Sequence, residues 1–335
     1  MAATPVLALV LATTVVLGLR AFAARLPYAA PSARGLHAAP IPRAGGWSIW
    51  AGFLPAALLW PPDVPGGLAP WLAPWLALLI LSAFDDARPV AVGVRLLVHF
   101  AAAAWFSASV LANMASPAWI ELPLGMRVAI GIVVTLLVTW SLNLYNFMDG
   151  SDALAGLMGV VGFGAYAAGS AFSASPEPAY VALTIAMLPF LVVNLPPARM
   201  FMGDVGSIPL GVLAAAFGIA GIVQQHWPGW FPGLVFLPFW SDATVTLARR
   251  ALRGQRVWEA HRDHYYQRLV RMGAGHRGTL ALYGAWMVAC AGTALGLLAF
   301  APQAGAAALL AWICIAGAFF AAIDYHWRRH SPTSP

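Results

Sequence analysis

Long apolar runs dominate this chain and constrain its fold more than any other feature. A helix needs about 20 apolar residues to cross a bilayer, and every backbone polar group inside the bilayer must be satisfied within the protein. Runs of roughly this length follow one another along the whole sequence. We predict eleven spans, over residues 4–24, 47–62, 68–84, 94–113, 126–145, 153–173, 179–195, 205–224, 230–248, 279–300 and 304–326.

Composition leads to the same fold class. Hydrophobic residues make up 61% of the chain and charged residues 9%, whereas soluble domains carry about a quarter charged residues. Cys290 and Cys314 both fall in apolar runs, which argues against a disulfide framework or a thiolate zinc site. The first run has no basic region before it, which favours a spanning helix over a cleavable signal. We therefore predict one all-α integral membrane domain over residues 1–335.

Arginine predicts how the helices are oriented, because basic residues concentrate in cytoplasmic turns. The chain has no lysine, so its net charge of +6 reflects arginine alone. Arginine clusters after the first, third, seventh and ninth spans and in the C-terminal tail. This pattern predicts an outside N-terminus and an inside C-terminus. The expected cytoplasmic loops lie near residues 25–46, 84–94, 146–152, 196–204 and 249–278.

Most other polar residues fall on the same predicted side, so we expect the active site on the cytoplasmic face. A transporter or channel, the main alternative, would instead place ionisable residues near the midplane and along a path to the outside. Asp242, within the ninth run, is the ambiguous case, although Arg249 or Arg250 is available to pair with it.

The stretch from Asn143 to Gly156 has the densest set of polar oxygens. Asn143 and Asn146 are three residues apart and share a face if the helix continues through them. Asp149 and Asp152 follow in a turn that contains glycine. Oxygen ligands at a membrane surface are typical of a magnesium–phosphate site. The alternative is structural, with Asp152 capping the next helix and the asparagines closing the previous one.

A second acidic group ends the third span. Asp85 and Asp86 lie at a helix C-terminus, where carboxylates are disfavoured, so they call for a cation: a metal, an arginine or a proton from a substrate. Arg88 would neutralise them in a purely structural cluster. Arg95, at the start of the next helix, is placed to face the same site and meet a phosphate.

Asp204 opens the eighth span, where helix N-terminal amides favour an anion. Asp204 is either an N-cap or, with the other carboxylates nearby, a metal ligand. Gly203 and Gly206 flank it closely and indicate that something approaches the backbone here.

Two basic loops complete the candidate site. His261 and His264 share a helical face beside Arg262, and the surrounding arginines suit a diphosphate. The alternative is an arginine-rich loop that follows the positive-inside rule or binds anionic lipid. The first turn, residues 31–46, is proline-rich and basic and is placed to cover the site. We count Arg43 in this turn, and Asn194, among the candidate substrate-binding residues.

Together these motifs resemble the polyprenyl-phosphate N-acetylhexosamine-1-phosphate transferases (glycosyltransferase family 4). That family includes the phospho-MurNAc-pentapeptide translocases and the enzymes that start O-antigen and other surface glycans. The matching motifs, in the family's order, are Pro31-x-x-Arg-x-x-His-x-x-Pro-x-Pro-Arg-x-Gly-Gly46, Asp85-Asp86, Asn143-x-x-Asn-Phe-Met-Asp-Gly-Ser-Asp152, Phe201-Met-Gly-Asp-x-Gly-Ser207 and His261-Arg-x-His-x-Tyr-Gln-Arg-Leu269.

The resemblance implies a reaction in which undecaprenyl or another polyprenyl phosphate attacks the β-phosphorus of a UDP-N-acetylhexosamine and releases UMP. Mg²⁺ is the implied cofactor, with Mn²⁺ as a substitute. Membrane lipid is an expected partner, nucleic acid is not, and a homodimer is one candidate assembly. The residues fall into a catalytic set (Asp85, Asp86, Asp149 and His264), a metal set (Asn146 and Asp204) and a substrate set (Arg43, Arg95, Asn143, Asp152, Asn194, His261 and Arg262).

Two departures refine the resemblance. The loop motif reads His-Arg-Asp-His and lacks the triple histidine of the peptidoglycan translocases, which favours the surface-polysaccharide branch. Ala153 stands where the family usually has glycine. A CDP-alcohol phosphotransferase is the other lipid enzyme considered, but its motif continues with aspartates that residues 153–176 lack. The sequence leaves the sugar, the glycan pathway and the choice between direct displacement and an aspartyl-phosphate open.

Overall fold

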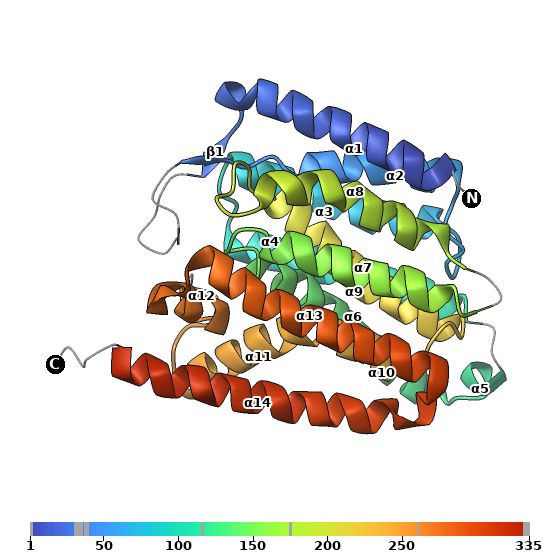
Figure 1. Cartoon of the computed structure of the whole chain (residues 1–335). Coiled ribbons are helices and arrows are strands. Elements are labelled where there is room, and N and C mark those ends of the chain that lie inside the picture. The colour runs from blue at the N-terminus through green and yellow to red at the C-terminus, as the bar shows by residue number, and fades with distance from the viewer. Residues whose placement is uncertain are drawn as a thin grey trace.

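The structure is a computed structural model that describes residues 3–29, 36, 40–114, 117–173, 176–259 and 261–330. Nearly all of its regular structure is helical (Figure 1). The elements are α1 (Ala3–Ala21), β1 (Tyr28–Ala29), β2 (Ile41–Pro42), α2 (Gly46–Leu59), α3 (Ala69–Ala87), α4 (Val92–Ala112), α5 (Pro117–Ile120), α6 (Leu124–Phe147), α7 (Leu154–Ser170), α8 (Pro178–Asn194), α9 (Asp204–Val223), α10 (Trp230–Val235), α11 (Leu237–Leu252), α12 (Tyr265–Leu269), α13 (Gly275–Phe300) and α14 (Gly305–His330).

Helix α9 is the centre of the bundle. It is apolar on all sides, as expected of a helix without a solvent face, and it packs against α2, α3, α4, α6, α7 and α10. Small residues permit this close packing. A Cβ at Gly211 would lie 2.6 Å from the Cα of Leu142 on α6, and the Ser141 hydroxyl donates to the Gly211 carbonyl at 2.7 Å. The residues at the start of α9 are therefore held from several directions.

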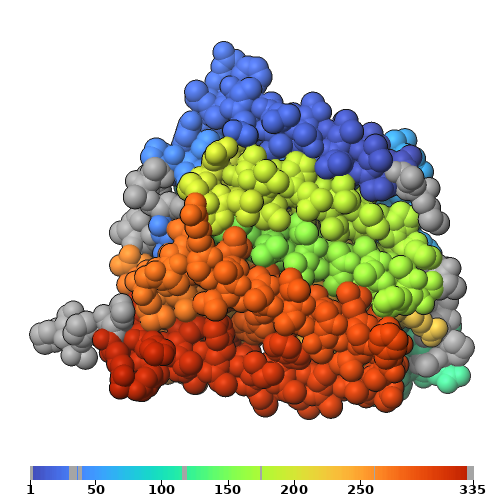
Figure 2. All heavy atoms as spheres, in the orientation of Figure 1, coloured from blue at the N-terminus to red at the C-terminus, as the bar shows by residue number. Residues whose placement is uncertain are grey.

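The outer helices present apolar side chains to their surroundings. Leu97 on α4, Ile132 on α6 and Leu310 on α14 are all exposed. Exposed apolar surface over several helices would be a liability in water but suits a bilayer. Figure 2 shows α1, α8, α7, α13 and α14 packed side by side over one face of the molecule.

The membrane character is confirmed, whereas the number of spans stays a prediction. Among the described residues, six helical stretches are long and apolar enough to cross a bilayer: α1, α4, α6, α9, the stretch of α12 and α13, and α14. Helices α2, α7 and α8 are apolar but shorter. The ninth expected span, 230–248, is divided between α10 and α11 at Phe236, just before Pro238, whose ring cannot donate a helix hydrogen bond.

The loop predicted over 249–278 is shorter than expected. Helix α11 extends to Leu252, and α12 begins at Tyr265. A wide helical turn over Val270–Ala274 then connects α12 to α13. Gly273 adopts a φ of +102° in this turn, a conformation that favours glycine.

The polar loops meet at one end of the bundle, which we call the polar end. It contains the chain between α3 and α4, the segment between α6 and α7, the loop before α9, and α12. The β1–β2 pair lies at this end as well, and α5 lies at the other (Figure 1). Backbone pairing joins distant loops here: Gly45 donates to the Phe201 carbonyl at 2.8 Å, and Gly46 to the Met202 carbonyl at 2.9 Å.

Candidate active site

Asp86 joins the C-terminus of α3 to the N-terminus of α9. Its carboxylate accepts hydrogen bonds from the backbone amides of Asp204, at 3.0 Å, and Val205, at 2.9 Å. It therefore caps α9 from another helix, where the partly positive helix end favours an anion. Arg43 Nη1 lies 3.5 Å from the same carboxylate. Asp86 was expected to need a cation, and the protein supplies part of that positive charge through Arg43 and the N-terminus of α9.

Asp85 pairs with Arg95 instead of with Arg88, the partner expected in a purely structural cluster. The Asp85 carboxylate forms an ion pair with the Arg95 guanidinium and accepts the Val90 amide at 2.6 Å. Arg95 also lies 3.7 Å from the Asp204 carboxylate. The structure thus places Arg95 between two carboxylates, facing the site as the sequence suggested.

The glycines around Asp204 are required by close packing. Gly203 has a φ of +76°, and a Cβ there would lie 2.6 Å from the Asp86 carboxylate. A Cβ at Gly206 would lie 3.0 Å from the Cα of Gly46. The close approach that the sequence indicated is made by these two parts of the protein itself.

Asp149 completes what we call the acidic cluster: Asp85, Asp86, Asp149 and Asp204, with Arg43 and Arg95. Burial raises the pKa of Asp149 well above its ordinary value, and the neighbouring charges of Asp204 and Asp86 add to this rise. Among the described residues the Asp149 carboxylate accepts no hydrogen bond. Four carboxylates against two guanidiniums leave a net charge of −2 when all are ionised, which favours a bound cation.

The asparagines of the central segment lie beside this cluster. Asn143 donates to the Thr139 carbonyl at 2.7 Å, and Asn146, the expected metal ligand, precedes the turn in which Asp149 donates to the Asn146 carbonyl at 3.1 Å. Across the described ranges, no three His, Cys, Asp or Glu side chains are arranged to hold a metal ion by themselves. Mg²⁺ does not need such a cage, because it takes one or two protein oxygens together with waters and substrate phosphates. The all-oxygen donor set fits it.

Asp152 and Asn194 face the protein. The Asp152 carboxylate accepts the Ala198 amide at 3.0 Å. Asn194 accepts the Ala153 amide at 2.8 Å and donates to the Met200 carbonyl at 2.7 Å. Both side chains are buried, so the structure gives them the role of tying the central segment to the loop before α9. Their assignment to substrate binding stays a prediction.

Ala153 explains one departure from the family pattern. It adopts a φ of +61°, the left-handed conformation that glycine enters without strain. The turn keeps the geometry that a glycine would have, with an alanine in its place.

Histidine 276, at the start of α13, is a polar contact that sequence reasoning did not identify. Its Nδ1 lies 2.9 Å from the Ser151 hydroxyl and 3.3 Å from the Asp152 amide. In the sequence, His276 is only a histidine beside Arg277 in a basic loop, and no motif there predicts its contact with Ser151.

Asp242 is fully buried and surrounded by donors. It accepts the backbone amides of Tyr265 and Tyr266, each at 3.0 Å, and the Tyr283 hydroxyl at 2.5 Å. His264 Nδ1 lies 3.3 Å from its carboxylate. The Thr246 hydroxyl donates to it as well, at 3.2 Å. We call Asp242 and these five donor residues the Asp242 hub.

The hub corrects one expectation. Arg249 and Arg250, the suggested partners of Asp242, pair instead with Asp324 and Asp263. Asp242 caps α12. It therefore gives no support to the transporter alternative, in which ionisable residues would line a path through the membrane. His264, expected to be catalytic, is almost fully buried as the N-cap residue that precedes α12.

Helix α12 docks directly on the central segment. The Tyr266 hydroxyl donates to the Phe147 carbonyl at 3.0 Å, and its ring stacks beside His264 with ring centroids 5.8 Å apart. Burial, together with the positive charges nearby, lowers the pKa of His261 to about 4, which leaves this imidazole neutral at neutral pH. Arg262 is exposed. Arg34 and His37 of the first turn lie outside the described residues.

Comparisons with known proteins agree with this arrangement. The profile of the family described as "Glycosyl transferase family 4" matches residues 68–222, which include the whole acidic cluster except Arg43. A decaprenyl-phosphate N-acetylglucosaminephosphotransferase from Mycobacterium tuberculosis is 29% identical, over 89% of this chain and 82% of its own. An undecaprenyl-phosphate alpha-N-acetylglucosaminyl 1-phosphate transferase from Yersinia pestis is 28% identical, over 82% and 78%.

A phospho-N-acetylmuramoyl-pentapeptide-transferase from Enterococcus faecalis is 32% identical but aligns with only 44% of this chain and 45% of its own. The relatives named for N-acetylglucosamine thus match over most of the chain. With the motifs gathered at one end of an all-helical membrane bundle, these matches confirm the resemblance: residues 68–222 match the profile of glycosyl transferase family 4, and most of the chain is similar to polyprenyl-phosphate N-acetylglucosamine-1-phosphate transferases.

Proposed function

We propose that this protein transfers an N-acetylhexosamine-1-phosphate from a UDP-sugar to a polyprenyl phosphate and releases UMP. The acidic cluster is the observation that carries the proposal. It gathers the carboxylates of three chain segments and two arginines at the polar end of the bundle, with a net charge of −2 when all of these groups are ionised. Phosphoryl transfer needs positioned anions and charge neutralisation more than covalent help.

Different residues of the acidic cluster serve different parts of the reaction. An oxygen of the lipid phosphate attacks the β-phosphorus, the bond to the UMP oxygen breaks, and UMP leaves with that electron pair. Arg95 and Arg43 are placed to hold phosphate oxygens in line. Asp149 has no side-chain hydrogen bond among the described residues, so in its ionised form it is available to take a proton from the attacking phosphate.

Mg²⁺ is the proposed cofactor, with Asn146 and Asp204 as its protein ligands and Mn²⁺ as a substitute. When bound, the ion would neutralise phosphate charge. Asp86 is engaged by two helix amides and Arg43, which disfavours it as a nucleophile and favours direct displacement. His261, Arg262 and His264 lie in the loop proposed to close over the diphosphate.

The names of the relatives support N-acetylglucosamine as the sugar, and 6-deoxy N-acetylhexosamines also fit the proposal. The proposed setting is a bacterial inner membrane, with the polar end in the cytoplasm. There a soluble UDP-sugar meets the lipid phosphate at the bilayer surface, in the first membrane step of O-antigen or other surface-glycan synthesis.

The test measures UMP release by the purified protein in detergent. It receives undecaprenyl phosphate, Mg²⁺ and, in turn, each of a panel of UDP-N-acetylhexosamines. We expect UMP only when the lipid phosphate, the metal and one accepted sugar are all present. Absence of UMP with every sugar, from protein that unfolds cooperatively, would overturn the proposal. Accumulation of substrate in sealed vesicles without UMP would instead indicate a transporter.

A further inference from the structure

Arg127 differs from the other arginines in where it lies. Every other arginine that the structure describes lies at or near the polar end, whereas Arg127 lies in the first turns of α6, at the end of the bundle that carries α5 (Figure 1). Basic residues of membrane proteins concentrate on one side of the bilayer. A single arginine on the opposite side is therefore a candidate for binding a ligand.

Arg127 has no acidic partner within the described part of the chain. Its guanidinium forms no ion pair there, and its Nε atom is buried without a hydrogen-bond partner. Glu177, a carboxylate at the same end of the bundle, accepts the backbone amides of Asp63 and Ala179 instead. An unsatisfied buried donor costs about 1–3 kcal/mol. The Arg127 side chain therefore indicates an acceptor that the protein itself does not supply.

The position of Arg127 within α6 adds to its need for an anion. It is the fourth residue of this helix, which begins at Leu124. The N-terminal turn of a helix is partly positive, so a cation there is disfavoured. No acidic residue lies in this turn, and no side chain caps it. A bound anion would offset both the guanidinium charge and the helix dipole.

Arg127 lines a groove between α4, α5 and α6, with a volume of about 1060 Å³. The other lining side chains are apolar, among them Ala108 and Leu111 of α4 and Val128 of α6. A Cβ at Gly131 would lie 3.4 Å from Leu111, so α4 and α6 approach each other closely beside the groove. The groove thus combines one cation with a hydrocarbon wall.

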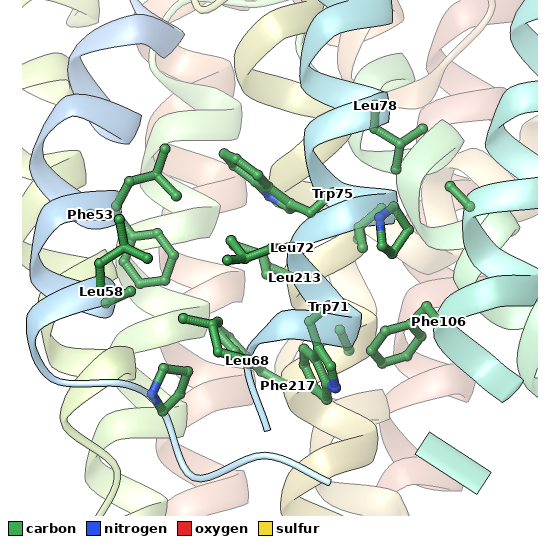
Figure 3. A pocket seen from close by; sticks show the side chains of 17 residues that line it. Phe53, Leu58, Leu68, Trp71, Leu72, Trp75, Leu78, Phe106, Leu213 and Phe217 are labelled. Carbon is green, nitrogen blue, oxygen red and sulfur yellow. The ribbon is translucent and has the colours of Figure 1, made fainter. Parts of the chain in front are cut away.

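This combination distinguishes the groove from the pocket between α2, α3, α4 and α9. That pocket is lined by apolar side chains throughout, among them Phe53, Leu72 and Phe106 (Figure 3). It contains no charged group that could select the head of a ligand. The groove does contain one, and this charge restricts the class of molecule that fits it.

The groove opens to the surface that the bundle presents to lipid. Ile120, Leu124 and Val128 line it and are all exposed, Leu124 by 70%. Trp119 of α5 lines it as well and is buried. Tryptophan is enriched where the hydrocarbon of a bilayer meets its headgroups. We therefore expect a lipid headgroup at the height of Arg127.

The groove is remote from the acidic cluster. Arg127 and Asn143 are 16 residues apart on α6, about 24 Å along its axis. The groove thus lies outside the site at which the sugar phosphate transfer is proposed, and its ligand does not depend on that proposal.

We infer that this groove binds a glycerophospholipid of the leaflet opposite the polar end, with the lipid phosphodiester at Arg127 and an acyl chain along the apolar wall. The planar guanidinium fork matches two phosphate oxygens. A soluble anion would leave the apolar wall uncovered, and an uncharged hydrocarbon would leave the guanidinium unpaired. A phospholipid satisfies both parts of the groove.

The first experiment measures lipid binding by native mass spectrometry of the whole protein in detergent, with phosphatidylglycerol as the probe. Arg127→Gln should raise the dissociation constant of the tightest-bound lipid about tenfold, which corresponds to about 1.4 kcal/mol. Arg20→Gln is the matched control, since Arg20 is exposed in the last turn of α1 at the polar end. It should change this constant less than about twofold. Equal effects of the two substitutions, or none of Arg127→Gln, would overturn the inference.

Two further probes separate the lipid from its parts. Diacylglycerol with the same acyl chains lacks the phosphate, and inorganic phosphate lacks the chains. We expect neither to displace phosphatidylglycerol from the wild-type protein at tenfold excess. Displacement by inorganic phosphate would reduce the groove to a simple anion site. Displacement by diacylglycerol would leave Arg127 without a role. Either result would overturn the inference.

Thermal unfolding separates lipid binding from a contribution of Arg127 to the fold. Phosphatidylglycerol at ten times its dissociation constant should raise the Tm of the wild-type protein by roughly 2–4 °C, and that of Arg127→Gln by less. Without added lipid the two proteins should unfold at similar temperatures, because the guanidinium has no partner to lose. A large fall in Tm without lipid would overturn the inference. So would loss of a dimer at unchanged lipid binding, which would assign the groove to a second copy of the chain.

The second experiment fills the groove. Ala108→Phe places a ring against the apolar wall and should raise the dissociation constant for phosphatidylglycerol about tenfold. Ala101→Phe is the matched control, because Ala101 is exposed on the same face of α4, two turns earlier, and does not line the groove. Equal affinities of the two variants would show that no acyl chain lies along this wall, and would overturn the inference.

Should Ala108→Phe fail to accumulate, photolabelling of the unchanged protein replaces it. The probe is phosphatidylglycerol with a diazirine on one acyl chain. Adducts on residues 108–112 and 119–128 support the groove, and adducts confined to other helices overturn it. Release of UMP is not the readout of any of these experiments, so a failure of the proposed function and a failure of this inference are distinguishable.

Discussion

The acidic cluster and the Asp242 hub solve the burial of carboxylates in opposite ways. Asp242 is a single buried carboxylate, and two backbone amides, two hydroxyls and an imidazole surround it. The acidic cluster holds four carboxylates against two arginines, and Asp149 accepts no hydrogen bond there among the described residues. A buried charge is tolerated when the protein satisfies it. The Asp242 carboxylate of the hub is fully hydrogen-bonded, whereas the Asp149 carboxylate of the acidic cluster accepts no hydrogen bond among the described residues.

This difference separates structure from function better than residue type or depth does. Both regions contain aspartates beside helix N-termini, and both bring together segments far apart in the sequence. The hub fixes α12 against α11 and α13, whereas the cluster keeps an excess of negative charge for a cation. Mutations in the two regions should therefore affect different measurements.

The largest effect is expected from Asp204→Asn. Asparagine keeps the size of the side chain but removes the charge proposed to bind Mg²⁺, so UMP release should fall at least about a thousandfold. The Tm should not fall, because the change also relieves repulsion from Asp85 and Asp86. Wild-type turnover would refute the metal assignment. A large drop in Tm would show that Asp204 stabilises the fold.

Asp242→Asn should act on stability. The amide keeps one acceptor oxygen for the five donors of the hub, and we expect the free energy of unfolding to fall by about 3 kcal/mol. Asp263→Asn, whose half-exposed carboxylate pairs with Arg250 in the same region, is the matched control. It should cost less than about 1 kcal/mol. Denaturation in detergent measures both, and equal losses would remove the contrast between hub and cluster.

Addition of Mg²⁺ tests the charge excess of the cluster directly. At ten times its dissociation constant the ion should stabilise the folded protein by about 1.4 kcal/mol, which raises Tm by roughly 2–4 °C. Asp204→Asn should abolish this rise. The Asp263→Asn control should retain it. A rise that persists in Asp204→Asn would mean that the ion binds elsewhere.

The sequence predicted the fold class and the polar end because apolar run length and arginine placement are direct consequences of the bilayer. It did not predict the break at Phe236 or the end of α11 at Leu252, since both depend on packing. Within the site, the family motifs identified the carboxylates of the cluster. They did not show that Asp152 and Asn194 point into the protein, because their partners are backbone amides placed by tertiary structure.

The smallest expected effect concerns the turn that touches both regions. Ala153 follows Asp149 of the cluster in the segment whose Phe147 carbonyl accepts the Tyr266 hydroxyl, and its φ of +61° costs about 1–2 kcal/mol. Ala153→Gly removes this strain but adds about 0.5–1 kcal/mol of unfolded-state entropy, so the net gain in stability should be about 0.5 kcal/mol. Turnover should stay within about twofold, because the backbone keeps its conformation. A larger change in turnover at unchanged stability would show that the left-handed turn positions Asp149 for the reaction. The segment would then serve catalysis and not only the stability of the fold.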